Sequence, residues 1–232
     1  MSFTPTSKSE LVSMISNWLS DSAAVTTNYG DINTWDTSQI TNMDDLFDSN
    51  DLGNSGFNNN ISNWNTSNVT SMKQMFRGTY GGNSFNQDIS TKQVTVNGNT
   101  YTAWDVSKVT DMQGMFEHAR SFNQPLDSWD VGNVINMHTM FNRTRYFNQS
   151  INSWDVGNVK DMFQMFCQTT DFNQDLGSWN TSNVTRMQQM FQQGSFNQDI
   201  GDWDVGNVTN MQHMFYQQSY FSQDINRWNI NS

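Results

Sequence analysis

The sequence has one cysteine, two prolines and only two glutamates. Cys167 stands alone, so the chain can form neither an intrachain disulfide nor a zinc site built from several cysteines. The acidity comes almost wholly from aspartate, because Glu10 and Glu117 are the only glutamates. With 22 acidic and 11 basic residues the net charge is −11, which disfavours partners such as nucleic acid or an anionic membrane surface.

Long apolar runs are also missing. No stretch approaches the roughly 18 consecutive apolar residues that a membrane-spanning helix needs. The first residues lack the basic start and the apolar stretch of a secretory signal peptide. We therefore expect no membrane insertion. We also expect either that the chain does not use the general secretory route or that its sequence is already processed.

In place of these features the sequence has an internal repeat. Eight of the nine tryptophans mark it, and from Trp104 onward they lie 24 or 25 residues apart. Asp or Asn follows each of them, and after the first seven an aliphatic residue comes at the fifth position and a methionine at the eighth. A Met-Phe pair comes next, replaced in the first unit by Leu46-Phe47. The repeat tryptophans, which we assign to the core, are Trp35, Trp64, Trp104, Trp129, Trp154, Trp179, Trp203 and Trp228.

Two insertions interrupt the repeat. The first lies within residues 48–56, before Phe57. The second, at residues 91–103, places alternating residues around Asn97-Gly98, a dipeptide typical of the two-residue turn of a β-hairpin. We expect a hairpin to project from the repeat there.

The repeat predicts an α/β repeat solenoid. The two methionines and the phenylalanine of a unit lie at i, i+3 and i+4, which places them on one face of a short helix. Residues with helix-capping side chains, such as Asn42 and Asp111, precede the first methionine in most units. The stretch from the Phe-Asn-Gln block to the tryptophan carries the strand signal, and stacked strands would form a parallel sheet opposite the helices.

We expect the chain to divide into two regions. Residues 1–30 would form an N-terminal capping helix with its lead-in, because Leu11, Ile15 and Trp18 have the spacing of one helical face. Residues 31–232 would form an eight-unit solenoid, in which no unit can bury its apolar face alone. The last unit is only half a unit and has no evident cap, so self-association through this C-terminal edge is one alternative.

One block of the repeat carries a resemblance. Residues 122–134, with the sequence FNQPLDSWDVGNV, are followed by Met137, Met140 and Phe141. This pattern recurs over about residues 31–232 and resembles the BspA-type leucine-rich-repeat surface proteins of mycoplasmas, other host-associated microbes, protists and large viruses. The resemblance implies a right-handed, leucine-rich-repeat-like solenoid, a role in adhesion or host contact, a location at the cell surface or outside the cell, and no catalytic residues. Since no secretory signal is evident, a virion or the cytoplasm are alternative locations.

The residue after each tryptophan is a candidate metal ligand, because a row of aspartates could bind calcium. This position takes Asp in five units and Asn in three, whereas a metal-binding carboxylate would not be so interchangeable. We therefore expect a structural hydrogen-bonding ladder and no metal site. Its residues are Asp36, Asn65, Asp105, Asp130, Asp155, Asn180, Asp204 and Asn229.

No catalytic or cofactor-binding motif stands out. His118, His138 and His213 do not share one position in the repeat, and there is no glycine-rich phosphate loop or metal-spaced histidine pair. We expect no catalytic residues, no bound cofactor and no enzyme activity.

Cations collect beside the Met-Phe pairs of the first units, where later units carry glutamine. This pattern predicts a helical ridge that is basic in its first half and neutral in its second. Simple solvation of the ridge is one interpretation, and a contact surface for an acidic protein or glycan is the other. The candidate contact residues are Lys73, Arg77, His118, Arg120, His138, Arg143 and Arg145.

The repeat and its charge pattern are compatible with two functions. The first is a non-enzymatic recognition or adhesion module, which binds a protein or glycan on another cell or particle through one face of the solenoid. The second is a structural subunit of a virion or surface layer, which assembles through the ends or faces of the solenoid. A stable monomer with a saturable ligand would favour the first, and concentration-dependent assembly would favour the second.

Overall fold

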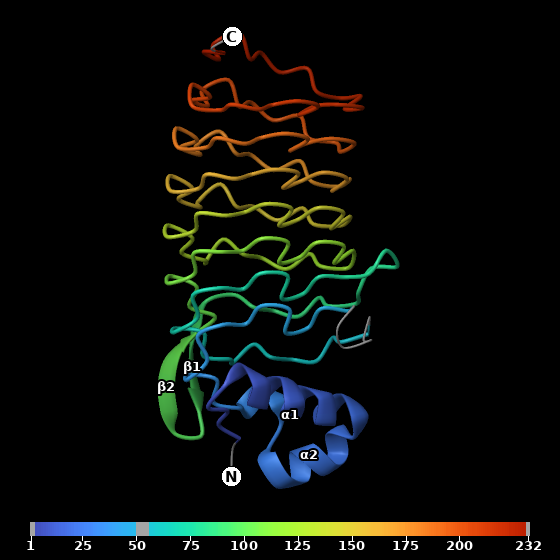
Figure 1. Ribbon diagram of the computed structural model, residues 1–232, viewed down its shortest axis with the longest axis vertical. Coiled ribbons are helices and arrows are strands. Elements are labelled where there is room, and N and C mark those ends of the chain that lie inside the picture. Colours follow the sequence, from blue (N-terminus) through green and yellow to red (C-terminus); the bar gives the residue numbers. More distant parts are fainter. Residues whose placement is uncertain (1–2, 50–55, 231–232) are drawn as a thin grey trace.

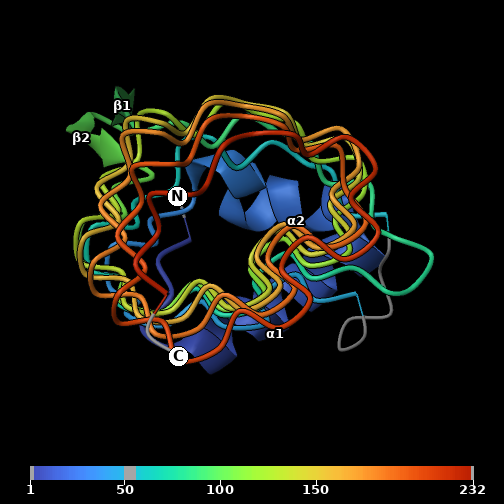
Figure 2. The same cartoon turned by 90° about the horizontal axis from the view of Figure 1, so that it is seen from above.

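The computed structural model describes residues 3–49 and 56–230, which form a stack of coils with the helices at its N-terminal end (Figure 1). In chain order the regular elements are α1 (Lys8–Ser20), α2 (Ser22–Tyr29), the 3₁₀ helix η1 (Ile32–Thr34), β1 (Lys92–Val96) and β2 (Asn99–Ala103). Viewed along the stack, successive coils superpose on one another (Figure 2). Residues that are one repeat apart in the sequence therefore lie above one another in space.

The predicted α/β repeat solenoid is wrong. Within residues 31–49 and 56–230 the units contain no α-helix and no parallel sheet, and the one sheet of the described chain is the antiparallel pair β1–β2. The units are built from turns and non-regular backbone. The pairing between them that comes nearest to a sheet is a row of isolated parallel bridges. These bridges join Asn42, Ser71, Asp111, Asn136, Asp161, Arg186 and Asn210 in that order.

The Met-x-x-Met-Phe segments form turns because their amides bond in two directions. In the fourth unit the amide of Met140 donates to the carbonyl of Met137, three residues back, at 3.2 Å. The amides of Met137, Thr139 and Phe141 donate instead to the next coil, at 3.0, 2.8 and 3.0 Å. An α-helix would use such amides internally, and a helix of two turns is marginal by itself. Bonding to the next coil therefore prevails over the predicted helix.

Backbone dihedral angles show the same departure from a helix. Thr139 has a φ of 52°, in the left-handed region that interrupts a right-handed helix. The same position in other units carries Asp45, Gln74, Gln164, Gln189 and His213, all with φ between 52° and 60°. The residues predicted as helix caps hold local turns instead, since the amide of His138 donates to Asn136 Oδ1 at 3.0 Å.

The Phe-Asn-Gln segments, predicted as strands, are joined mainly through side chains. Asn123 Oδ1 accepts the amide of Asn148 in the next coil at 3.0 Å and Gln149 Nε2 at 2.9 Å. The tryptophans form a second ladder, in which Trp154 Nε1 donates to the carbonyl of Leu126 in the preceding coil at 2.9 Å. Such bonds satisfy polar groups that stacking would otherwise bury unpaired.

The core consists of aromatic columns that run along the stack. The ring of Phe141 lies 5.5 Å from that of Phe116 and 5.6 Å from that of Phe166, with interplanar angles of 5°. It also lies 4.1 Å from Phe147 in a second column and 6.3 Å from Trp154. All eight repeat tryptophans are buried. Each unit thus contributes one equivalent ring to each column, and the neighbouring coils bury that ring.

The region predicted as an N-terminal cap, residues 1–30, contains α1, which lies against the first coil, and α2, which packs against α1 (Figure 1). Ser7 caps α1 by accepting the amide of Glu10 at 3.2 Å. Leu11, Ile15 and Trp18 are buried, and the ring of Trp18 lies 6.0 Å from that of Trp35. The apolar face of α1 therefore covers the apolar end of the stack.

In the segment predicted as a hairpin, β1 and β2 pair antiparallel from Lys92–Ala103 to Val96–Asn99. The turn residues Asn97 and Gly98 have φ of 52° and 85°, as a two-residue hairpin turn requires. The hairpin does not project freely, because it turns back toward the N-terminal end of the stack (Figure 1). The other predicted insertion, at 48–56, falls largely outside the described residues.

Candidate functional site

The structure gathers three of the seven predicted ridge residues around one cavity. Arg120, Arg143 and Arg145 line a space of about 430 Å³. Its other lining residues are Gln168, Thr170 and Gln193. All six follow the Phe of a Met-Phe pair in four successive coils, so the stacking of equivalent positions brings them together. We call this space the arginine cavity.

The three arginines of the arginine cavity form no ion pair within the described residues, and the carboxylate of Glu117 interacts with Arg143 only through the longer-range attraction of their charges. In the part of the chain that the structure describes, the ion pairs form elsewhere and none involves these three arginines. Arg120 donates to the carbonyl of Tyr80 at 2.6 Å, and the guanidinium of Arg143 lies 5.4 Å from the Tyr80 ring centroid. The guanidinium of Arg145 lies 5.4 Å from the ring of Tyr146. The contacts that position the three cations are thus made by neutral groups.

Arg77 and His118 line a neighbouring cavity of about 210 Å³, but neither offers a free charge there. Arg77 Nε donates to Asp48 Oδ2 at 2.9 Å, and Arg77 Nη2 donates to the same oxygen. Burial, and after it the charges of Arg143, Arg120 and Arg77, lower the pKa of His118 to about 4. At neutral pH His118 is therefore uncharged.

Lys73 and His138, the remaining predicted ridge residues, line neither of these two cavities. His138 Nδ1 lies 3.5 Å from Asp161 Oδ2, and its ring stacks on Phe163 with centroids 4.7 Å apart. The predicted basic ridge thus divides into a charged cavity, a structural ion pair and a neutral histidine, with Lys73 and His138 placed apart.

The later coils carry two ladders of glutamines, and one of them occupies the position at which earlier coils carry His118 and Arg143. Gln164 Nε2 donates to Gln189 Oε1 at 2.7 Å, and Gln168 Nε2 donates to Gln193 Oε1 at 2.5 Å. Gln193 continues the ladder to Gln217. Two members of this ladder form the neutral wall of the arginine cavity.

The predicted ladder of residues after the tryptophans consists of local turns. Asp130 Oδ1 accepts the amide of Gly132 at 3.1 Å, and Asp155 Oδ1 accepts the amide of Gly157 at 2.9 Å. In other units the side-chain oxygen likewise accepts the amide of the residue two positions later in the same coil. These units carry Asp36, Asn65, Asp105, Asn180 and Asp204. Asn229 is exposed. Asp and Asn offer the same acceptor oxygen in such a turn, which explains their exchange.

Reactive and ion-binding groups are few. Over residues 3–49 and 56–230, no three His, Cys, Asp or Glu side chains are grouped so that they could hold a metal ion. Burial raises the pKa of the Cys167 thiol to about 11, which keeps it protonated and unreactive. None of the helices described here combines the length and apolar character needed to cross a membrane.

The last coil leaves an apolar cavity of about 420 Å³ at the C-terminal edge, lined by Met214, Phe215 and Trp228 among others. In earlier coils the first methionine and every second residue after it donate an amide to the next coil. In the last coil the corresponding amides have no backbone acceptor in the described part of the chain. They belong to Met211, His213, Phe215 and Gln217.

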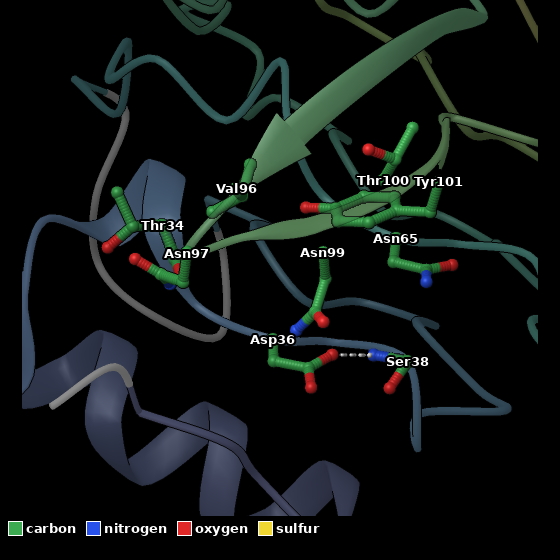
Figure 3. A pocket seen from close by; sticks show the side chains of 9 residues that line it. All are labelled: Thr34, Asp36, Ser38, Asn65, Val96, Asn97, Asn99, Thr100 and Tyr101. Atoms are coloured by element: carbon green, nitrogen blue, oxygen red, sulfur yellow. Dashed lines mark hydrogen bonds between the residues drawn. The ribbon is translucent and has the colours of Figure 1, made fainter.

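One cavity was not predicted from the sequence. It has a volume of about 210 Å³ and lies between the hairpin and the first coils, with Asp36, Asn65 and Tyr101 in its lining (Figure 3). The alternation of residues in 92–103 indicated a hairpin but not the side against which it packs. That contact joins residues 38 positions apart, as between Tyr101 and Asn63.

The neutral state of His118 should make stability depend on pH. The folded chain holds its pKa at about 4, against 6.5 for a free histidine. Between these values the unfolded chain binds a proton that the folded chain does not, so this contribution to stability is present above pH 6.5 and is lost as the pH falls toward 4. His118→Gln introduces the residue that later coils carry at this position. We expect the difference in unfolding free energy between this variant and the unaltered chain to change by about 2 kcal/mol between pH 6.5 and pH 4. Urea denaturation of both proteins at several pH values measures it, and a difference independent of pH would contradict this account.

The chain matches a known family over residues 13–100, 91–195 and 151–232, with the description "Mycoplasma protein of unknown function, DUF285". No curated protein and no solved structure matches it. The family match includes most of α1, the hairpin and the coils that form the arginine cavity. The chain therefore belongs to the DUF285 family of Mycoplasma proteins of unknown function.

Proposed function

We propose that this protein is a non-enzymatic recognition module that binds an anionic partner, an acidic protein or glycan, at the arginine cavity. The observation that carries the proposal is the convergence of Arg120, Arg143 and Arg145 without an ion pair, in a chain whose net charge is −11. Three like charges at one place repel one another, and a bound anion would relieve that repulsion.

The chemistry of the cavity suits oxyanions. The planar guanidinium offers paired donors that match a carboxylate, a sulfate or a phosphate group. Gln168, Gln193 and Thr170 line the rest of the cavity with neutral polar groups, and no carboxylate is among its lining residues. Because the rest of the chain is acidic, the cavity would attract an anion at short range while the remaining surface repels it, which favours specific over general binding.

This role requires that the cavity be accessible to another cell or particle. We therefore propose a location at the cell surface or outside the cell, in keeping with the resemblance of the repeat to BspA-type surface proteins. No catalytic role is proposed for any residue of the cavity.

A structural subunit of a virion or surface layer is the second candidate, and the open C-terminal edge favours it. Continuation of the coil ladder between two copies meets an obstacle, however. Two C-terminal edges would bring amide donors against amide donors, and the N-terminal end is covered by α1. The arginine cavity therefore carries the stronger argument.

The test is binding of heparin and of a poly-aspartate peptide, as sulfated-glycan and acidic-protein probes, to the full chain. We expect saturable binding to at least one probe, and a loss of affinity of about 30-fold or more when Arg120, Arg143 and Arg145 are all changed to Gln. The matched control changes Lys8, Lys108 and Lys160 to Gln, which removes the same charge elsewhere and should weaken binding only a few-fold. Equal losses in the two variants would show general electrostatic attraction and contradict the proposal, as would binding of neither probe by the unaltered chain.

A further inference from the structure

The pocket beside the hairpin is separate from the arginine cavity and shares none of its lining residues. It encloses about 210 Å³ between β1–β2 and the first two coils. Figure 3 shows the ring of Tyr101 on one side and Asp36 with Ser38 on the other, with Asn99 between them. We call it the hairpin pocket.

The tip and the second strand of the hairpin are held against the coils by specific bonds. Tyr101 Oη donates to the carbonyl of Asn63 at 2.6 Å, and Asn97 Nδ2 donates to the carbonyl of Thr34 at 3.2 Å. Burial, and then the charge of Asp36, raises the pKa of Tyr101, so its hydroxyl stays protonated as a donor. The pocket wall formed by the hairpin is thus fixed on two different coils.

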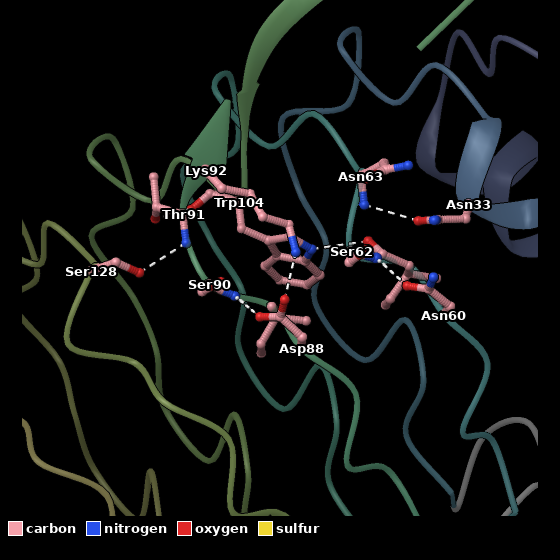
Figure 4. A network of polar contacts seen from close by, with 12 residues as sticks. Asn33, Asn60, Ser62, Asn63, Asp88, Ser90, Thr91, Lys92, Trp104 and Ser128 are labelled. Carbon is pink, nitrogen blue, oxygen red and sulfur yellow. Dashed lines mark hydrogen bonds and ion pairs between the residues drawn. The ribbon is translucent and has the colours of Figure 1, made fainter. Parts of the chain in front are cut away.

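The base of the hairpin is tied down as well (Figure 4). The amide of Thr91 donates to Ser128 Oγ at 2.9 Å, and Lys92 Nζ forms an ion pair with Asp88 at 2.5 Å. The amide of Asn63, the residue whose carbonyl accepts the Tyr101 hydroxyl, donates to Asn33 Oδ1 at 2.8 Å. A pocket whose walls are already ordered loses little conformational entropy when a ligand binds.

Several polar groups of the hairpin pocket have bonding capacity left. Asp36 Oδ1 accepts the amide of Ser38 at 3.1 Å, while Asp36 Oδ2 has no hydrogen-bond partner in the described chain. Asn65 Oδ1 accepts the amide and the hydroxyl of Ser67 at 3.1 and 2.7 Å, which leaves its NH₂ group as a donor. The side chain of Asn99 forms no hydrogen bond within residues 3–49 and 56–230, so it offers both a donor and an acceptor.

This set of groups selects a class of ligand. No cation lines the pocket, which disfavours an anion, and its single carboxylate is too few for a metal ion. An ammonium group only donates and would leave the amide NH₂ donors unpaired, whereas a hydroxyl both donates and accepts. Tyr101 and Val96 add apolar surface for the C–H face of a ring. The volume lies below the roughly 300 Å³ of typical drug-sized pockets, which suits one ring.

We propose that the hairpin pocket binds one neutral sugar ring, held by hydroxyl bonds to Asp36, Asn65 and Asn99 and by contact with Tyr101. The ligand is recognised by its uncharged hydroxyls, so this site works independently of the arginine cavity. A glycan could occupy it whatever the partner of the arginines is.

The test is titration of the isotopically labelled full chain with methyl glucoside, methyl galactoside, methyl mannoside and N-acetylglucosamine, followed by amide NMR shifts. We expect at least one sugar to cause saturable shifts in residues 97–101. Asp36→Asn should weaken that binding about tenfold, because it removes the charged acceptor but retains the Oδ1 that holds Ser38. Asn99→Ala, at an exposed residue whose side chain forms no hydrogen bond in the described chain, should weaken it similarly without affecting folding.

The matched control is Asp155→Asn, the same change at the equivalent position of a coil away from the hairpin, and it should leave sugar binding unchanged. The variant with Arg120, Arg143 and Arg145 changed to Gln should also bind sugar normally. Absence of saturable shifts with all four sugars would overturn the proposal. Affinities unaltered by Asp36→Asn and Asn99→Ala would overturn it too, and so would saturation of the same residues by methylammonium in place of the sugars.

Discussion

Replacing Phe141 by alanine is expected to lower the free energy of unfolding by about 3–5 kcal/mol. The side chain is fully buried, and four aromatic rings surround it in its own and the two adjacent coils. The equivalent rings of the neighbouring coils are held at their own heights by backbone bonds, so they cannot close the space that alanine leaves. The cost therefore includes both the lost burial and an unfilled cavity.

The matched control is Phe215→Ala in the last coil. Phe215 is half-buried, and the column continues from it on one side only, to Phe191 at 5.9 Å. We expect this change to cost about half as much as Phe141→Ala, because less area is buried and solvent can reach the site. Guanidinium denaturation followed by circular dichroism measures both variants. Equal costs at the two positions would mean that stacking between coils contributes little.

Replacing Arg77 by methionine is expected to cost about 3–5 kcal/mol, although the sequence alone suggests a surface ligand contact. The Asp48 side chain is completely buried, whereas 27% of the Arg77 side chain is exposed. The hydrogen bond and charge of Asp48 raise the pKa of Arg77 despite burial, which by itself would lower that pKa. Removing the arginine leaves a carboxylate in the interior without its cation, and that loss dominates the cost.

Two comparisons separate this effect from a general loss of charge. Arg186→Met breaks an ion pair with Asp161 whose side chains are 42% and 22% exposed, and should cost less than about 1 kcal/mol. The double variant Arg77→Met with Asp48→Asn should recover much of the stability lost in the single variant, because no charge is left buried. Chemical denaturation of the four proteins measures these differences. Similar losses at Arg77 and Arg186 would contradict a buried pair.

Phe141 lies at a position that carries phenylalanine in successive units, whereas the arginine cavity uses positions that vary between units. At the second residue after the Met-Phe pair, one coil has His118, the next Arg143 and the following ones glutamine. All of these residues have φ near 57°, so the backbone presents each side chain in the same way. The stack thus converts differences between repeat units into an ordered row of surface groups.

The burial of the repeat tryptophans and the place of the hairpin could be predicted, because each depends on local pattern. The tryptophan spacing is visible in the sequence, and Asn97-Gly98 is a strong turn signal by itself. The arginines of the candidate site were also visible as cations at equivalent positions. The different role of Arg77 could not be predicted, because it depends on an ion pair with Asp48, which lies 29 residues away in the chain.

The sequence by itself determined the period of the chain, its acidic balance and which residues are apolar enough to form a core. Only the tertiary structure decided the backbone conformation within a unit. Spacing of i, i+3 and i+4 fits a helix considered alone, yet the amides of Met137 and Phe141 bond to the next coil, and no local pattern reveals that competition. The same holds for the two candidate sites, because a cavity exists only where stacking brings together side chains that are far apart in the chain.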